Sequence, residues 1–236
     1  MRFPKVFALA GLSVGLMISG PAHANLIING GFESPVGPGL TGQGFLPNPW
    51  VTIPVGADTY SNDASYGLSP SSFGNFAGVT AFQGNRFAAG WSLVPEIFGE
   101  SLGGPLTAGT SYILSGALHQ ALRSDLDHPG GYDVYAATGL GDTAPLFLVN
   151  TGSTIDDAAW ETFSVNFIAP FGVGTRSFLM FSPEANNANL PAYPGIDALD
   201  LSPSTVTTVP EPITLSLFGT GLAGAVTLRR RKKKAA

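Results

Sequence analysis

The chain has 236 residues, no cysteine, 44% hydrophobic residues and a formal net charge of −5. The lack of cysteine excludes disulfides, a thiol nucleophile and cysteine-based metal sites. Residues 25–209 hold three arginines and no lysine against fifteen acidic residues, so the formal charge of this part is −12. Because phosphate backbones and anionic lipid surfaces are bound by clustered cations, this charge argues against nucleic acid and an anionic membrane face as partners, whereas neutral sugars and divalent cations remain compatible.

Residues 1–24 predict a secretory signal peptide. Two cations precede an apolar run from Val6 to Ser19, and the small residues Ala22 and Ala24 form an A-x-A cleavage site. Cleavage there makes Asn25 the mature N-terminus and places the following residues outside the cytoplasm. An uncleaved N-terminal anchor is the alternative.

Residues 25–201 predict one antiparallel all-β domain, a sandwich or barrel. Short apolar runs alternate with turn-forming residues, and we find no long 3.6-residue period with end caps. The expected strands, in chain order, are Leu26–Phe32, Trp50–Val55, Ala77–Phe82, Asn85–Leu93, Ser111–His119, Tyr132–Thr138, Pro145–Val149, Trp160–Ile168, Ser177–Phe181 and Ile196–Leu201. Residues 202–208 are short, polar and β-branched, which favours a linker.

Four short motifs of this domain resemble strands of the jelly-roll domains in the carbohydrate-binding-module and galactose-binding-like group. They are Asn25–Glu33, Thr110–Ser115, Trp160–Phe163 and Gly195–Leu201, and they occur in the order of that group. The resemblance implies an antiparallel jelly-roll β-sandwich. The chain departs from the pattern at Ala198, where members of the group usually carry a second aspartate.

The same resemblance implies a structural calcium ion between the first and last strands. The matching positions are Glu33, Asp197 and Asp200. Calcium prefers oxygen ligands from carboxylates and carbonyls, and the acidic domain would accommodate a cation. The alternative is that these carboxylates are solvated residues at strand edges.

Aromatic residues in loop-like regions are candidates for stacking against the apolar faces of sugars. We single out Trp50, Trp91 and Tyr193, and Tyr193 is expected to be exposed because prolines flank it on both sides. Tyr60 and Tyr66 lie in similar surroundings. The alternative for each ring is burial in the core, which needs large side chains.

Two groups of residues are candidates for hydrolytic chemistry. Glu96 and Glu100 could form the carboxyl pair that glycosidases need. A cluster with H-x5-D-x-D-H spacing could bind a transition metal or supply a general base, with a polar hairpin loop as the alternative. Its members are His119, Asp125, Asp127 and His128. The domain has no G-x-S-x-G, H-E-x-x-H or P-loop motif, so we expect a protein that is not an enzyme.

Residues 209–236 predict a membrane-targeting tail. Pro210, Glu211 and Pro212 form a stiff extended segment. Residues 213–228 are uncharged and apolar, and at ~1.5 Å per residue they reach roughly 24 Å as a helix, less than the ~30 Å bilayer core. Residues 229–234 are six consecutive cations, which stay on the cytoplasmic side. A short run of this kind favours a temporary stop in the membrane over a permanent tail anchor, which is the alternative.

This tail resembles the PEP-CTERM sorting signal of Gram-negative bacteria. In that family an exosortase, a membrane-embedded cysteine transpeptidase, recognises the tail, which is removed during export. The resemblance implies that the partners are exosortase and the Sec and signal peptidase machinery, with a transient inner-membrane contact. It also implies a location at the cell surface or in the extracellular matrix. We therefore expect an exported protein that binds glycans or exopolysaccharide; a secreted polysaccharide-active hydrolase and a passive surface protein are the alternatives.

Overall fold

The computed structural model describes residues 25–34, 43–53, 56–63, 67–154, 159–173, 176–187 and 190–204. The predicted signal peptide, the sorting segment, Tyr66 and residues 205–208 of the expected linker lie outside these residues. Within the described ranges there are ten β-strands and one short 3-10 helix, η1 (Ser72–Gly74). No helix in that part of the chain has the length and apolar character needed to cross a bilayer.

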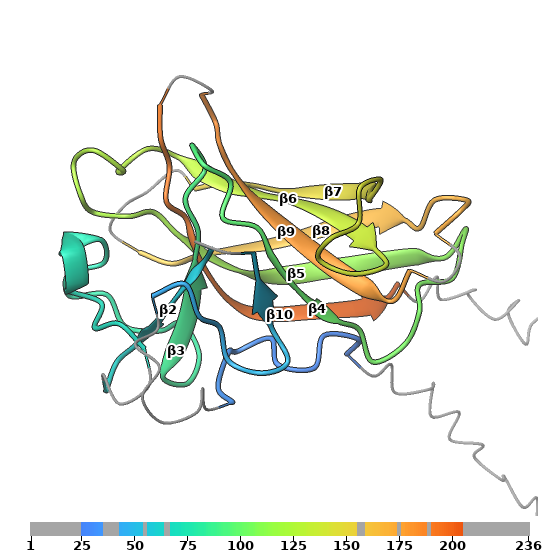
Figure 1. Cartoon of the computed structure of the whole chain (residues 1–236), viewed down its shortest axis with the longest axis horizontal. Helices are drawn as coiled ribbons and strands as arrows, with labels where there is room; N and C mark the ends of the chain where they lie inside the picture. The colour runs from blue at the N-terminus through green and yellow to red at the C-terminus, as the bar shows by residue number, and fades with distance from the viewer. Residues whose placement is uncertain are drawn as a thin grey trace, which may run out of the picture.

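The strands form two antiparallel five-stranded sheets, seen as two layers in Figure 1. Sheet A has the order β1-β4-β9-β6-β7 and sheet B the order β2-β3-β10-β5-β8. The strands of sheet A are β1 (Val51–Thr52), β4 (Phe98–Ser101), β6 (Gly130–Ala137), β7 (Leu146–Ser153) and β9 (Phe178–Ala185). Those of sheet B are β2 (Asp58–Ser61), β3 (Arg86–Ala89), β5 (Ser111–His119), β8 (Glu161–Ile168) and β10 (Gly195–Pro203). This architecture confirms the predicted all-β jelly-roll sandwich.

One hydrophobic core lies between the sheets. Sheet A contributes Phe98 and Phe181, whose rings stack at a centroid distance of 5.4 Å, and sheet B contributes Leu114, Ile196 and Leu201. All five side chains are fully buried. Because successive residues of a strand point to opposite faces, a strand that borders this core buries one of its faces there.

A second aromatic cluster covers the other face of sheet B at β2 and β3. Ala88 points into the main core, whereas its neighbours Phe87 and Ala89 belong to this second cluster. Tyr60 of β2 stacks on Phe87 at 5.2 Å, and Phe76 meets both rings edge-on. The loops that cover this face of sheet B therefore pack on an apolar surface.

The strands with clear alternation were predicted at or near their observed bounds. Strand β5 has the predicted bounds, and β8 begins one residue later than expected. Along β8 the side chains of Phe163, Val165 and Phe167 face the core, as their spacing predicts. Strand β9 lies at the centre of sheet A, which agrees with its continuously apolar start.

Other parts of the strand prediction were wrong. Residues 26–32 form no strand, because the backbone turns at Phe32, where φ is 55°. Residues 77–82 are not a strand, and β2 and β4 were not predicted. Strand β10 continues through Pro203, so residues 202 and 203 belong to the sheet and not to the linker.

Candidate functional site

A pocket of about 210 Å³ opens beside the second aromatic cluster. Its walls include Asp58 from β2, Asn75 directly after η1, and Trp91, Glu96 and Tyr193 from two loops. Pockets for drug-sized ligands have volumes of about 300–1,000 Å³. This pocket is smaller, so it fits a group of about the size of one sugar ring.

Hydrogen bonds donated by backbone amides close one loop of the pocket and join it to the other. The Trp91 amide donates to Glu96 Oε2 at 2.8 Å, and the Glu96 amide donates to the Trp91 carbonyl at 3.1 Å. The Ser92 amide donates to the Ala192 carbonyl at 3.0 Å, and the Ala192 amide returns a bond to Ser92 Oγ at 2.9 Å. The loop that carries Trp91 and Glu96 is therefore fixed against the segment that carries Tyr193.

A directed chain of hydrogen bonds runs along the floor of the pocket and ends at a carboxylate. Asn75 Nδ2 donates to the Tyr60 hydroxyl at 2.8 Å, and this hydroxyl donates to the Tyr193 hydroxyl at 3.4 Å. Tyr193 donates to Asp58 Oδ2 at 2.6 Å, while the Gly44 amide donates to Asp58 Oδ1 at 2.6 Å. Asp58 thus accepts one hydrogen bond on each oxygen.

Burial of the two acidic side chains changes their protonation. It raises the pKa of Asp58, and the hydrogen bonds from Tyr193 and Gly44 oppose this effect. Burial raises the pKa of Glu96 to about 7, the Trp91 amide opposes it, and the nearby charge of Asp58 raises it further. Glu96 therefore exchanges its proton near neutral pH.

Two residues that line the pocket each carry a buried polar atom that has no hydrogen-bond partner among the described residues. The two atoms are Asn75 Oδ1, on a side chain that is 4% exposed, and Trp91 Nε1. A buried polar group without a partner costs about 1–3 kcal/mol, so both atoms gain from a ligand that supplies one. Phe73 also lines the pocket and is 56% exposed, which offers an apolar face beside the polar groups.

The structure brings two of the three predicted sugar-stacking residues together. Trp91 and Tyr193 line the same pocket, but the expectation that Tyr193 is exposed was wrong, since it is 4% exposed and packs edge-on against Tyr60. Trp50 is 3% exposed, and its ring stacks on Phe32 at 4.8 Å inside the main core. Trp50 therefore presents no face to a ligand.

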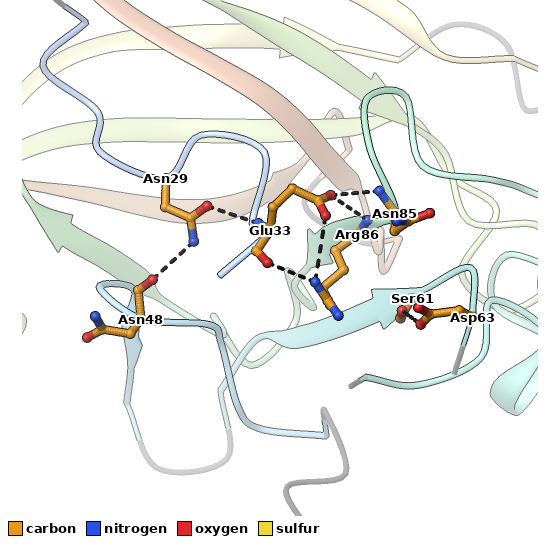
Figure 2. Close-up of polar contacts among 7 residues, drawn as sticks. All are labelled: Asn29, Glu33, Asn48, Ser61, Asp63, Asn85 and Arg86. Atoms are coloured by element: carbon orange, nitrogen blue, oxygen red, sulfur yellow. Dashed lines mark hydrogen bonds and ion pairs between the residues drawn. The ribbon is translucent and has the colours of Figure 1, made fainter. Parts of the chain in front are cut away.

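One of the residues predicted to bind calcium, Glu33, contacts an arginine. Glu33 Oε1 accepts from the amides of Asn85 at 2.7 Å and Arg86 at 2.9 Å, as Figure 2 shows. Arg86 Nη1 donates to the Glu33 carbonyl at 2.8 Å and lies 3.6 Å from Glu33 Oε2. The positive charge that faces Glu33 is thus a guanidinium.

The other two predicted calcium ligands are engaged elsewhere. Asp197 accepts from the amides of Gln83 at 2.9 Å and Ala198 at 2.6 Å, and burial raises its pKa to about 7. Asp200 accepts from Ser202 Oγ at 3.2 Å. In the described part of the chain, no group of three or more His, Asp or Glu side chains is placed to hold a metal ion. Each of the three carboxyl groups thus accepts a hydrogen bond within the protein, and calcium binding by Glu33, Asp197 and Asp200 stays a prediction.

The carboxyl pair predicted for hydrolysis is divided between two places. Glu96 lines the pocket, whereas Glu100 is buried in β4, where its Oε1 accepts from the Ile28 amide at 2.7 Å. Glu100 Oε2 has no partner among the described residues, and burial raises the pKa of Glu100 to about 7. The carboxyl group that shares the pocket with Glu96 is Asp58.

The predicted histidine and aspartate cluster does not form a metal site among the described residues. The ring of His119 is buried against Trp160 at 5.3 Å, and its Nδ1 lies 2.6 Å from the Gln120 carbonyl. Asp125 forms an exposed ion pair with Arg123 at 2.5 Å. Both contacts are structural.

Comparison with known families places a sorting signal at the C-terminus. Residues 208–232 match the PEP-CTERM protein-sorting motif. The chain therefore carries a PEP-CTERM motif, which implies export, exosortase processing and a surface or extracellular location. A comparison with curated proteins finds no match.

Solved structures share the fold of the domain. An apo cyclase from Fischerella sp. is 16% identical, with a TM-score of 0.50, and the match covers 80% of this chain and all of that one (100%). TmCBM61 in complex with β-1,4-galactotriose is 18% identical, with a TM-score of 0.40 and coverage of 77% and 99%. The CBM22-2 xylan-binding domain from Paenibacillus barcinonensis Xyn10C is 10% identical, with a TM-score of 0.45 and coverage of 66% and 92%. At this identity and TM-score, the similarity to the Fischerella cyclase is one of fold.

Proposed function

We propose that this protein is an exported glycan-binding protein that holds a sugar unit in the pocket between Asp58 and Trp91. The observation that carries the proposal is the pair of buried, unpartnered atoms Asn75 Oδ1 and Trp91 Nε1 on residues that line that pocket. One accepts and the other donates, which matches a sugar hydroxyl because a hydroxyl does both.

The rest of the pocket has the mixed character that sugar recognition needs. Trp91 and the exposed ring of Phe73 offer apolar surface for the C–H face of a sugar. Asp58 and Glu96 offer carboxylate oxygens to further hydroxyls, and hydrogen bonds to charged groups contribute about 1.5–3 kcal/mol each. The fixed loops keep the groups in place before the ligand arrives, which lowers the entropy cost of binding.

The sorting motif suggests where such binding takes place. A protein that is delivered to the cell surface meets extracellular polysaccharide, so we propose the exopolysaccharide of the producing cell as the natural ligand. The domain charge of −12 disfavours strongly acidic polymers, since like charges repel.

Titration calorimetry with the exported protein and isolated exopolysaccharide tests this proposal. We expect the Asn75→Ala and Trp91→Phe variants to bind at least about tenfold more weakly, because each removes one of the unpartnered atoms. Phe147→Ala is the control, since Phe147 is an exposed aromatic residue of sheet A outside the pocket. If only the control lost affinity, the pocket would be the wrong site; if no glycan bound, the function would be wrong.

A second candidate function is glycoside hydrolysis. The observation in its favour is that Glu96, with a pKa of about 7, shares the pocket with a second carboxyl group, Asp58. Glycosidases use one protonated and one ionised carboxyl group. Hydrolysis would be supported if Glu96→Gln abolished turnover of a glycan without abolishing its binding. If the natural protein turned over no glycan, hydrolysis would be excluded.

A further inference from the structure

We infer that the pocket selects sugars that carry a protonated amine over sugars that carry only hydroxyl groups. This inference rests on the proposed glycan-binding function and adds the chemical class of the ligand. It follows from the hydrogen-bond acceptors that line the pocket, from its two carboxyl groups and from its aromatic rings.

Three side chains on the pocket wall offer hydrogen-bond acceptors. The Asp58 and Glu96 carboxyl groups accept hydrogen bonds, and the unpartnered atom of Asn75 is also an acceptor, Oδ1. The unpartnered donor is Trp91 Nε1. An ammonium group has three donors and no acceptor, whereas a hydroxyl group has one donor. The pocket therefore suits an ammonium group next to a hydroxyl or ring oxygen that accepts from Trp91.

Among the described residues, neither Asp58 nor Glu96 forms an ion pair. The ion pairs of the three domain arginines engage Glu33, Asp125 and Asp142 instead. Arg123 does line the pocket, but its Nε and Nη2 atoms donate to the two oxygens of Asp125 at 2.5 and 3.1 Å. Its charge is thus paired with Asp125, which is not among the lining residues.

A bound cation would relieve the cost of burying these carboxyl groups. Burial raises the pKa of both Asp58 and Glu96, which means that their charged forms are poorly solvated. An opposite charge within ~4–6 Å favours the charged form, so an ammonium group would ionise Glu96 and release a proton. A neutral hydroxyl group supplies no such charge.

The rings of the pocket add to the preference. Trp91 and Phe73 both line it, and a cation over an aromatic face is attracted by the ring, most strongly by that of tryptophan. A carboxylated sugar would instead meet two carboxyl groups, which is unfavourable. The expected order of affinity is therefore amine, then neutral, then acidic sugars.

Three β-1,4-linked trisaccharides that differ at C2 test the inference: cellotriose with hydroxyl groups, chitotriose with amines and its N-acetylated form. Titration calorimetry of the exported protein is done at about pH 6.5, where a primary amine is protonated. We expect chitotriose to bind at least about tenfold more tightly than the other two. Asp58→Asn and Glu96→Gln should each remove most of this preference, and circular dichroism shows whether each variant is folded.

The control is Asp133→Asn, which removes one negative charge from β6 outside the pocket. It should keep the preference for chitotriose. If it lost as much as Asp58→Asn, the attraction would be general to the acidic domain and the inference would be overturned. Equal binding of cellotriose and chitotriose, with loss in Trp91→Phe, would overturn the inference but support glycan binding. If neither the three sugars nor the exopolysaccharide bound, both the inference and the proposed glycan-binding function would be overturned.

Discussion

The hydroxyl of Tyr193 donates a 2.6 Å hydrogen bond to the carboxylate of Asp58, although 135 positions separate the two residues. Asp58 begins β2, and Tyr193 lies two residues before β10. Both side chains are buried, so this bond joins the edge strand of sheet B to the loop that leads into the central strand of that sheet. The Tyr193 hydroxyl therefore helps to position Asp58 in the pocket.

Removal of that hydroxyl should loosen the pocket. The Tyr193→Phe variant leaves Asp58 with one hydrogen bond fewer, and we expect the free energy of unfolding to fall by about 1–3 kcal/mol. Since that bond lowers the pKa of Asp58, the pKa should rise further. Urea unfolding at pH 7 measures the loss. Tyr135→Phe, which removes a 3.3 Å bond to Asp133 on a partly exposed face, is the control and should cost less; equal losses would contradict this account.

The fold could be predicted where the sequence alternates. Strands β5 and β8 carry apolar residues at every second position, and their pairing buries one face each. Strand β2 reads Asp-Thr-Tyr-Ser, which has too few apolar residues to be distinguished from a loop, yet all four side chains are buried. Strand β2 is buried because loops cover the second face of sheet B. Burial by distant parts of the chain produces no alternating pattern in the sequence of the strand.

The site could be predicted only in part. Trp91 and Tyr193 were candidates because they are aromatic residues in loop-like regions, and Tyr193 is also flanked by prolines. Asn75 and Asp58 could not be predicted, because the sequence does not show which polar residues of a loop or a short strand will be buried beside a pocket. Trp50 was a wrong candidate, since core and surface tryptophans look alike in a glycine-rich chain, and its indole bonds the Asn29 carbonyl inside the sandwich.

Glu100 should make the stability of the domain depend on pH. Burial raises its pKa from 4.5 to about 7, so the folded state holds the proton more tightly than the unfolded state. The stabilisation is complete below about pH 4.5 and falls as the pH rises through about 7, by about 3 kcal/mol in total. The Glu100→Gln variant should show a clearly smaller loss of stability between pH 5 and 8, measured by urea unfolding. An unchanged slope would show that Glu100 is ionised in the folded protein.

Arg86 should take the role that the family resemblance gave to calcium. Arg86→Met keeps the length of the side chain but removes the two guanidinium contacts with Glu33, while the bond from the backbone amide of residue 86 remains. The loss should cost about 1–3 kcal/mol because the guanidinium is a charged donor. Thermal unfolding of the natural protein with and without a chelator is the second measurement. We expect the same midpoint in both, and a midpoint that rises with added calcium would support the predicted calcium site.

The two prolines of the sorting segment should control its processing. Proline fixes φ and holds the preceding residue in an extended geometry, which is the form that processing enzymes reach. In producing cells, fractionation followed by intact-mass measurement should find a protein outside the inner membrane without the cationic residues 229–234. A Pro210→Ala/Pro212→Ala variant should accumulate at the inner membrane with its tail intact, whereas Pro203→Ala, in β10, should be processed normally. An intact tail on the natural protein at the inner membrane would mean that the motif acts as an anchor.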